Sequence, residues 1–203
     1  MKYYLSSYKI GNKANKLRKM IQASKSIGYV PNAIDYAGLK IKREKNKTGM
    51  KELADIGISV ELLDLKKYFG KEKELKKKID ELGGIWVRGG NTFVLRQAMR
   101  LSGLDKILKK MHRKDFVYGD YSAGGCVLSK NLKFLQIVDD PKIMPYKTKE
   151  VIWKGLGLIS FAFLPHYKSD HPESKDIDKE VEYCKKNKVP YRTLKDGEVI
   201  IIE

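Results

Sequence analysis

Two stretches of this sequence decide its fold: GGIWVRGGN at residues 83–91 and DFVYGDYSAGG at residues 115–125. Each is an apolar run that ends in glycine and other small residues, and each leads into a segment with helical character. A strand, a tight turn and a helix in this order form the repeating unit of an α/β sheet. Both stretches therefore predict a strand that brings a polar turn to the edge of the sheet.

The same alternation extends through the rest of the chain. We expect further strands over residues 2–7, 26–31, 58–65, 132–138, 157–165 and 198–202. We expect helices over residues 13–24, 35–57, 66–82, 92–101, 106–114 and 175–186, the second of them broken near residues 45–49. This pattern predicts an α/β protein with a mostly parallel sheet and helices on both faces. No linker rich in glycine, proline and serine divides the chain, so we expect one domain over residues 1–203.

The composition is that of a globular protein with a basic surface. The 203 residues include 42 lysines and arginines against 25 aspartates and glutamates, a net charge of +17. No run approaches the ~18 uncharged apolar residues of a membrane span, and the N-terminus lacks signal-peptide features. Cys126 and Cys184 are too few for a disulfide framework. We expect a cytoplasmic protein with no membrane partner.

The positive charge admits two interpretations. A net charge of +17 suits a nucleic-acid-binding protein. The lysines, however, alternate with acids in helical segments such as residues 66–82, and no aromatic–basic or zinc-finger motif occurs. We favour a solvated lysine-rich surface and expect no specific nucleic-acid partner. A basic nucleic-acid-binding domain is the less favoured alternative.

Ser122 lies in the second glycine-containing turn, between an apolar strand and small residues that begin a helix. A serine in such a turn projects from the sheet edge, and the amides that follow point at the group that its oxygen attacks. The other interpretation is a helix N-cap without a catalytic role. The turn alone does not decide between the two.

A nucleophilic serine needs a base, and the chain contains three histidines. His112 lies in a basic helical segment and His171 in a polar loop, whereas His166 follows the apolar run of residues 157–165. His166 is the better candidate because a strand would fix it at the same sheet edge as Ser122.

The base in turn needs a carboxylate that orients its imidazole. Asp139 and Asp140 lie between the serine and the histidine in the chain, which is the serine–acid–histidine order of other α/β hydrolases. Asp120 is a further carboxylate close to the serine. Each of the three can also be a turn residue, and Asp-Pro is a natural turn.

The oxyanion needs hydrogen-bond donors. A glycine pair after a strand lets the backbone approach the reacting carbon. The amides of Gly90 and Ala123 would form a two-donor oxyanion hole, worth about 3–4 kcal/mol per donor in comparable enzymes. The glycines do not form a P-loop or a dinucleotide fingerprint. We expect no cofactor and no metal.

Four motifs in order, VRGGNTFVLRQAM, YSAGGCVLS, VDDP and LPHY, resemble the peptidase E family of serine peptidases, relatives of aspartyl dipeptidase and cyanophycinase. The resemblance implies a class I glutamine-amidotransferase-like fold, a flavodoxin-like three-layer sandwich. It also implies Ser122 as nucleophile, His166 as base and Gly90 with Ala123 as oxyanion hole. Asp139, with Asp140 next, best matches the family's acid.

The sequence departs from the family at three places. The family has glycine at the position of Asp120, and its glycine triplet begins where this chain has Arg88. We expect Arg88 and Asn91 to contact the substrate, with Arg88 pairing with a carboxylate; the alternative is a structural pair between Arg88 and Asp120. The arginine that holds an aspartyl carboxylate in aspartyl dipeptidases has no counterpart within residues 168–180.

These observations predict a dipeptidase-like serine hydrolase that cleaves a short peptide or amide bond, as a monomer or homodimer. The alternative is a catalytically inactive glutamine-amidotransferase-like binding protein, to which Asp120 and Arg88 point.

Overall fold

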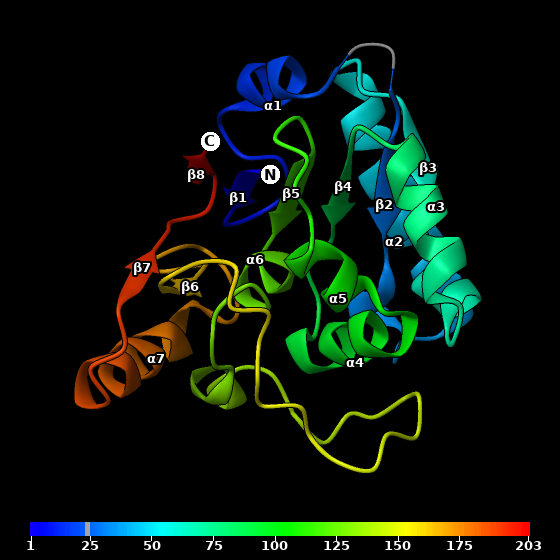
Figure 1. Cartoon of the computed structure of the whole chain (residues 1–203). Coiled ribbons are helices and arrows are strands. Elements are labelled where there is room, and N and C mark those ends of the chain that lie inside the picture. Colours follow the sequence, from blue (N-terminus) through cyan, green and yellow to red (C-terminus); the bar gives the residue numbers. More distant parts are fainter. Residues whose placement is uncertain (23–24) are drawn as a thin grey trace.

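A six-stranded sheet forms the centre of the computed structural model, which describes residues 1–22 and 25–203 (Figure 1). The strand order is β3-β2-β4-β5-β1-β8. The strands are β1 (Lys2–Ser6), β2 (Ile27–Val30), β3 (Val60–Leu62), β4 (Gly84–Val87), β5 (Val117–Tyr121) and β8 (Val199–Ile202). All neighbours are parallel except β1 and β8, which are antiparallel. The expected mostly parallel α/β sheet is confirmed.

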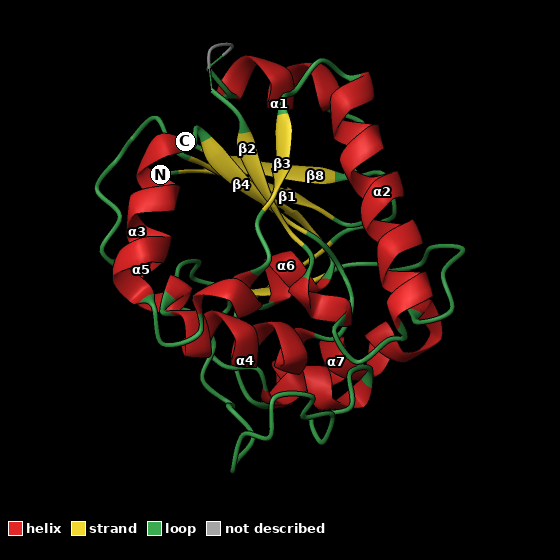
Figure 2. Cartoon of the chain, turned by 90° about the vertical axis from the view of Figure 1, so that its right-hand side faces the viewer, coloured by secondary structure: helices red, strands yellow, loops and turns green. Residues whose placement is uncertain are grey.

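Helices cover both faces of this sheet (Figure 2). They are α1 (Ala14–Met20), α2 (Leu39–Asp55), α3 (Glu72–Glu81), α4 (Thr92–Ser102), α5 (Leu104–Lys109), α6 (Ala123–Cys126) and α7 (Ser174–Lys186). Successive strand residues point to opposite faces, so Tyr4 packs with α1 and α2 whereas Leu5 packs with α3 to α7. The two buried clusters thus make the sheet the middle layer of three.

Shorter elements complete the chain. Three 3₁₀ helices are η1 (Asn32–Ile34), η2 (Leu65–Tyr68) and η3 (Lys133–Ile137), and β6 (Ala162–Leu164) pairs in parallel with β7 (Tyr191–Thr193) in a second, two-stranded sheet. Among the described residues, no helix combines the length and the apolar character needed to cross a membrane.

Three expectations about individual elements are wrong. The helix expected over residues 35–57 is not broken, because Gly49 lies inside α2 and its missing side chain leaves room for the ring of Tyr29. Residues 132–138 form η3 instead of a strand, since the Asn131 side chain accepts a hydrogen bond from the Lys133 amide at 2.9 Å and starts a tight turn. The strand expected over residues 157–165 is limited to β6 and lies outside the main sheet.

The sequence prediction also differs from the structure at one strand and at one helix. The structure contains β7, which the sequence pattern did not predict. The helix expected over residues 13–24 is α1 in its first part, and residues 23 and 24 lie outside the described residues.

The strand order brings the functional turns together at one edge. β4, β5 and β1 are adjacent and parallel, so their carboxyl ends meet there. Because β8 runs antiparallel and pairs Val199 with Ser6, the loop before β8 reaches the same edge. In open α/β sheets this edge is where ligands bind.

Candidate active site

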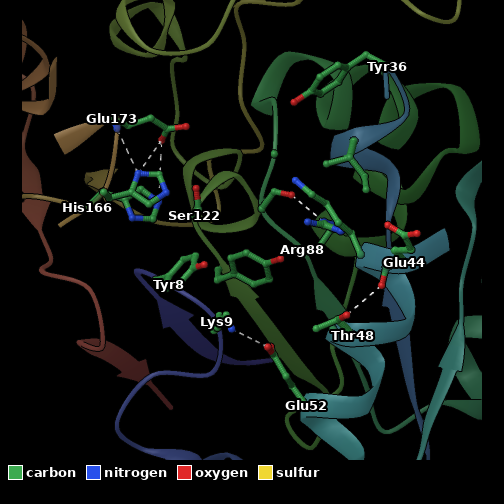
Figure 3. Close-up of a pocket in the computed structure, with 17 residues that line it drawn as sticks. Tyr8, Lys9, Tyr36, Glu44, Thr48, Glu52, Arg88, Ser122, His166 and Glu173 are labelled. Carbon is green, nitrogen blue, oxygen red and sulfur yellow. Dashed lines mark hydrogen bonds and ion pairs between the residues drawn. The ribbon is translucent and has the colours of Figure 1, made fainter. Parts of the chain in front are cut away.

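Ser122 occupies a sharp turn between β5 and α6. Its backbone has φ 51° and ψ −116°, a conformation that is uncommon for a residue with a side chain. The Ser122 amide donates to the Ser6 carbonyl at 3.1 Å, and the Ser122 carbonyl accepts from the amides of Gly125 and Cys126. The turn is therefore held on both sides, and its hydroxyl points into a cavity (Figure 3).

Small residues let α6 begin directly against β4. A Cβ atom on Gly124 would collide with the Val87 carbonyl, and one on Gly125 would lie 2.7 Å from the Phe163 ring. The small residues after the serine are thus a steric requirement, because any side chain at Gly124 would push the helix away from the strand.

Two backbone amides beside Ser122 have no acceptor. Gly90 has φ 145°, and a Cβ atom there would lie 2.5 Å from the Ala33 carbonyl, so only glycine fits. Within residues 1–22 and 25–203, the amides of Gly90 and Ala123 donate no hydrogen bond. Both residues line the small cavity that also touches Ser122. Their donors are available to a ligand atom at this point.

His166 is held from the side opposite the cavity. Its Nδ1 lies 2.6 Å from Asp196 Oδ1, and its side chain is 2% exposed. Asp196 Oδ1 also accepts from the Ser7 hydroxyl at 2.9 Å, and the Ser7 oxygen accepts from the His166 amide at 2.8 Å. A carboxylate only accepts hydrogen bonds, so the contact places a proton on Nδ1. In the neutral ring Nε2 then carries no proton and is an acceptor.

Asp139 and Asp140 do not contact the imidazole, so the expectation that either one orients it is wrong. The Asp139 carboxylate accepts from the Thr92 amide at 2.8 Å, at the start of α4. The Asp140 carboxylate accepts from the Lys142 amide at 2.9 Å. The physical reason is that the preceding residues form η3 instead of a strand, and the chain after η3 brings Asp139 to the start of α4.

Asn91 also serves the fold. Its Oδ1 accepts from the Val94 amide at 2.9 Å as the N-cap of α4, and its Nδ2 donates to the Asp140 carbonyl at 3.0 Å. Both ends of the amide are occupied, so the side chain is not directed at the cavity that Ser122 faces.

Arg88 lines this cavity, as expected from its position before the glycine pair. The side chain is 7% exposed, and its Nε donates to the Gly89 carbonyl at 2.9 Å. Its Nη1 is buried with no partner among the described residues. The alternative pair with Asp120 does not form: Asp120 is fully buried, and neither of its carboxyl oxygens has a hydrogen-bond partner in the described chain.

The cavity has a volume of about 440 Å³, within the size range of small-ligand sites. Ser122 lies on its floor between Arg88 on one side and His166 on the other (Figure 3). The wall is completed by Tyr8 after β1, by Glu44 of α2 and by residues before α7.

Burial shifts the ionisation of the groups around Ser122. Burial, together with His171, lowers the pKa of His166, and the Asp196 carboxylate opposes this shift. Burial raises the pKa of Asp139 to about 6, and burial with the neighbouring Asp139 and Asp196 raises that of Glu173 to about 7. A neutral imidazole near pH 7 is the form that can accept a proton.

His166, His171 and Glu173 form a compact group of ligand-type side chains. The two imidazole rings, however, stack with centroids 3.7 Å apart and planes at 9°. A metal binds in the plane of an imidazole at about 2.0–2.1 Å from nitrogen, and an ion in one ring plane would be too far from the other ring. This arrangement is therefore not one that coordinates a metal through both histidines.

Asp196 is the residue that sequence reasoning missed. It stands in the turn KDGE before the last strand, where an aspartate before glycine is an ordinary turn residue. Asp196 follows His166 in the chain, whereas Asp139 was selected because it lies between Ser122 and His166. The only available signal was its position before a strand that had to join the sheet.

Sequence relatives identify the family. The chain matches the model of peptidase family S51 over residues 7–203. An uncharacterised peptidase of Listeria monocytogenes is 29% identical over 168 residues, which are 81% of this chain and 77% of that protein. Peptidase E of Streptomyces coelicolor is 30% identical over 131 residues, which are 62% of this chain and 51% of that protein.

Solved structures share the fold. A candidate peptidase E protein from Listeria monocytogenes superposes with a TM-score of 0.75 at 24% identity, covering 100% of this chain and 98% of that one. A peptidase from an acI-B1 actinobacterium superposes with a TM-score of 0.69 at 14% identity, covering 100% and 83%. At these identities the two structures establish the flavodoxin-like fold. The family match over nearly the whole chain establishes more: this protein belongs to peptidase family S51, a family of serine peptidases.

Proposed function

We propose that the protein cleaves short peptides with Ser122 as nucleophile, His166 as base and Asp196 as the acid that orients it. The observation that carries the proposal is the 2.6 Å contact between His166 Nδ1 and Asp196, in a histidine that lines the same cavity as Ser122. A serine, a histidine and a carboxylate with these contacts are recognised by their roles and not by their order in the chain.

The reaction follows from these positions. As Ser122 Oγ attacks the peptide carbonyl carbon, His166 Nε2 takes the hydroxyl proton, and Asp196 stabilises the imidazolium that forms. The same Nε2 then delivers the proton to the leaving amine, and the acyl group stays on Ser122. Water, deprotonated by Nε2, hydrolyses this acyl-enzyme and restores the serine.

The oxyanion is stabilised by the amides of Gly90 and Ala123. Both donors are free, and the turn and the glycine backbone hold them in place before substrate arrives. Donors that are fixed in advance stabilise the transition state because no reorganisation is required during the reaction.

The cavity favours a short, dipeptide-sized substrate that carries a carboxylate. Its volume of about 440 Å³ suits a small ligand. Arg88 lines this cavity, and a guanidinium pairs well with a carboxylate. Arg88 is thus the proposed anchor for that group, beside the nucleophile.

The triad is tested with a fluorophosphonate probe followed by peptide mapping and by peptidase assays. The wild-type protein is expected to be labelled on Ser122, and Ser122→Ala to be unlabelled. Asp196→Asn is expected to slow labelling and turnover by about 10³- to 10⁴-fold, because the imidazole loses its correct tautomer. Asp139→Asn is the matched control, since it removes a carboxylate that accepts from the Thr92 amide at the start of α4 and makes no hydrogen bond to the imidazole.

Two outcomes would reject the assignment. Folded wild-type protein that remains unlabelled at Ser122 would show that the serine is not activated. Equal losses in Asp196→Asn and Asp139→Asn would show that the contact with Nδ1 has no special role.

A further inference from the structure

A second histidine lies flat against the proposed base. The rings of His171 and His166 have centroids 3.7 Å apart and planes at 9°. His171 comes from the loop before α7, and its side chain is 22% exposed, whereas that of His166 is 2% exposed. The outer ring therefore covers a face of the inner ring and separates it from solvent.

The groups around His166 come from four segments of the chain. Asp196, before β8, binds Nδ1 at 2.6 Å, and Glu173 Oε2, before α7, lies 4.0 Å from Nε2. The Tyr8 ring, after β1, meets the imidazole edge-on at 6.0 Å. The uncharged Ser122 faces the shared cavity from the turn after β5. His171 is the group that covers a ring face.

A backbone contact fixes the form of His171. The Glu173 amide donates to His171 Nδ1 at 3.3 Å, so this nitrogen is an acceptor and the neutral ring carries its proton on Nε2. Tyr8 supports the outer ring edge-on at 5.8 Å. His171 is thus held in one orientation by Glu173 and Tyr8.

We propose that His171 is a positioning residue for His166: its stacked ring fixes the plane of the base within the cavity that Ser122 lines, and its own positive charge, when present, opposes protonation of that base. The proposal rests on the proposed function, in which His166 is the base. It adds a role for a residue outside the triad.

The physical basis is that two parallel imidazoles at this distance cannot both become cations without strong repulsion. A positive charge on the outer ring therefore disfavours protonation of the buried inner ring. The inner ring then stays neutral to lower pH than it would alone. The direction agrees with the lowered pKa of His166, to which burial contributes most and His171 next.

The decisive measurement is an NMR titration of the imidazole signals. The chain has only three histidines, so each signal can be assigned by substitution. In the wild-type protein the His166 signal is expected to titrate below the range of an ordinary imidazole. His171→Phe keeps an aromatic ring on His166 but removes the charge, and it is expected to raise the midpoint of His166 by about one pH unit.

A pH profile of kcat/KM provides the functional readout. The acidic limb is expected to move upward by the same amount in His171→Phe. His171→Asn, which has no ring to stack, is expected to move the limb in the same direction and also to lower kcat. The control is His112→Phe, because His112 is exposed and lies outside the cavity residues; its limb is expected to match the wild type.

An unchanged His166 midpoint in both His171 variants, with a folded spectrum, would overturn the proposal. The titration needs no turnover, so it distinguishes this outcome from a failure of the proposed function. Protein that shows the expected midpoint shift but no labelling of Ser122 would keep the coupling of the two rings and reject the peptidase.

Discussion

Among single residues, Arg88 departs most informatively from the family pattern. It replaces a small residue next to the oxyanion glycines, and its Nε holds the Gly89 carbonyl at 2.9 Å while Nη1 remains free. A buried guanidinium donor without a partner is costly to the apo protein.

Arg88→Met should lower kcat/KM by about 10- to 100-fold on peptides with a carboxylate near the cleaved bond, because hydrogen bonds to charged groups contribute about 1.5–3 kcal/mol. The assay compares free and C-terminally amidated dipeptides, and N-terminal aspartyl with asparaginyl dipeptides. These pairs identify which carboxylate binds. Equal losses on every substrate, together with a lower Tm, would instead indicate that Arg88 only supports the glycine turn.

Asp120 also departs from the family pattern, and it is a packing residue. It lies beneath α6. A Cβ atom added to Gly124 would be 2.8 Å from the Asp120 Cβ, and one added to Gly125 would be 2.9 Å from Asp120 Oδ1. Burial raises the pKa of this carboxyl well above its usual range, against a smaller opposing effect of the Ser6 backbone. Asp120 is thus a neutral packing residue under the nucleophile turn, and the carboxylate beside the base is Asp196.

At the scale of elements, the start of α6 determines whether the site exists. The helix has four residues, so little propensity holds it in place. Its position depends on contact with α4, β5 and β6, and on the close approach of Gly124 to Val87 of β4. Gly124 is the closest of these contacts, beneath the Val87 carbonyl.

Gly124→Ala should lower stability by about 1–3 kcal/mol through overpacking, a Tm decrease of roughly 2–12 °C for a chain of this size. Turnover should fall by about 100-fold, since a shift of about 1 Å at the reacting groups has that effect. Gly38→Ala is the control: Gly38 has φ −61°, and an added Cβ would meet nothing within 4 Å. Thermal melts and peptidase assays of both variants check the prediction, and similar behaviour of the two would refute it.

At the scale of the whole molecule, this strongly basic protein removes several of its carboxyl groups from solvent. Burial raises the pKa of Asp120, Asp139, Glu173 and Glu180. Glu180 on α7 is 1% exposed, and neither carboxyl oxygen has a hydrogen-bond partner among the described residues. The positive surface charge comes mostly from lysines, and these lysines form no ion pair with the four carboxyl groups in the described chain.

The sign of their effect on stability follows from linkage. An unfolded glutamate ionises near pH 4.3, whereas Glu180 in the folded protein keeps its proton to higher pH. The folded state then holds more protons, so the stability that Glu180 contributes is complete below about pH 4 and is lost as pH rises through its raised pKa.

Glu180→Gln, which is neutral at every pH, should therefore gain in Tm relative to the wild type between pH 5 and pH 8, by a few degrees at pH 8. Thermal melts by circular dichroism at both values measure this difference. Glu182→Gln on the exposed side of the same helix is the matched control, expected to show no such trend. A Tm difference independent of pH would show that Glu180 is ionised in the folded protein.

Local pattern was enough to predict where several of the candidate site residues lie. Apolar runs that end in small residues placed Ser122, Gly90 and Ala123 at strand ends, because a buried strand followed by a tight turn has a short-range signature in the sequence. His166 was found the same way, although its strand is the short β6 in a second sheet. The mostly parallel sheet followed from the alternation of strands and helices.

The partner of the imidazole was decided only by the tertiary structure. Asp196 reaches His166 because β8 pairs antiparallel with β1, a contact between the two ends of the chain that no local spacing encodes. Asp139 was excluded by the turn that made η3 a 3₁₀ helix, which directs its carboxylate to the Thr92 amide. Sequence periodicity reports which residues are buried within one element, whereas the neighbours of a side chain depend on strand pairing between distant segments.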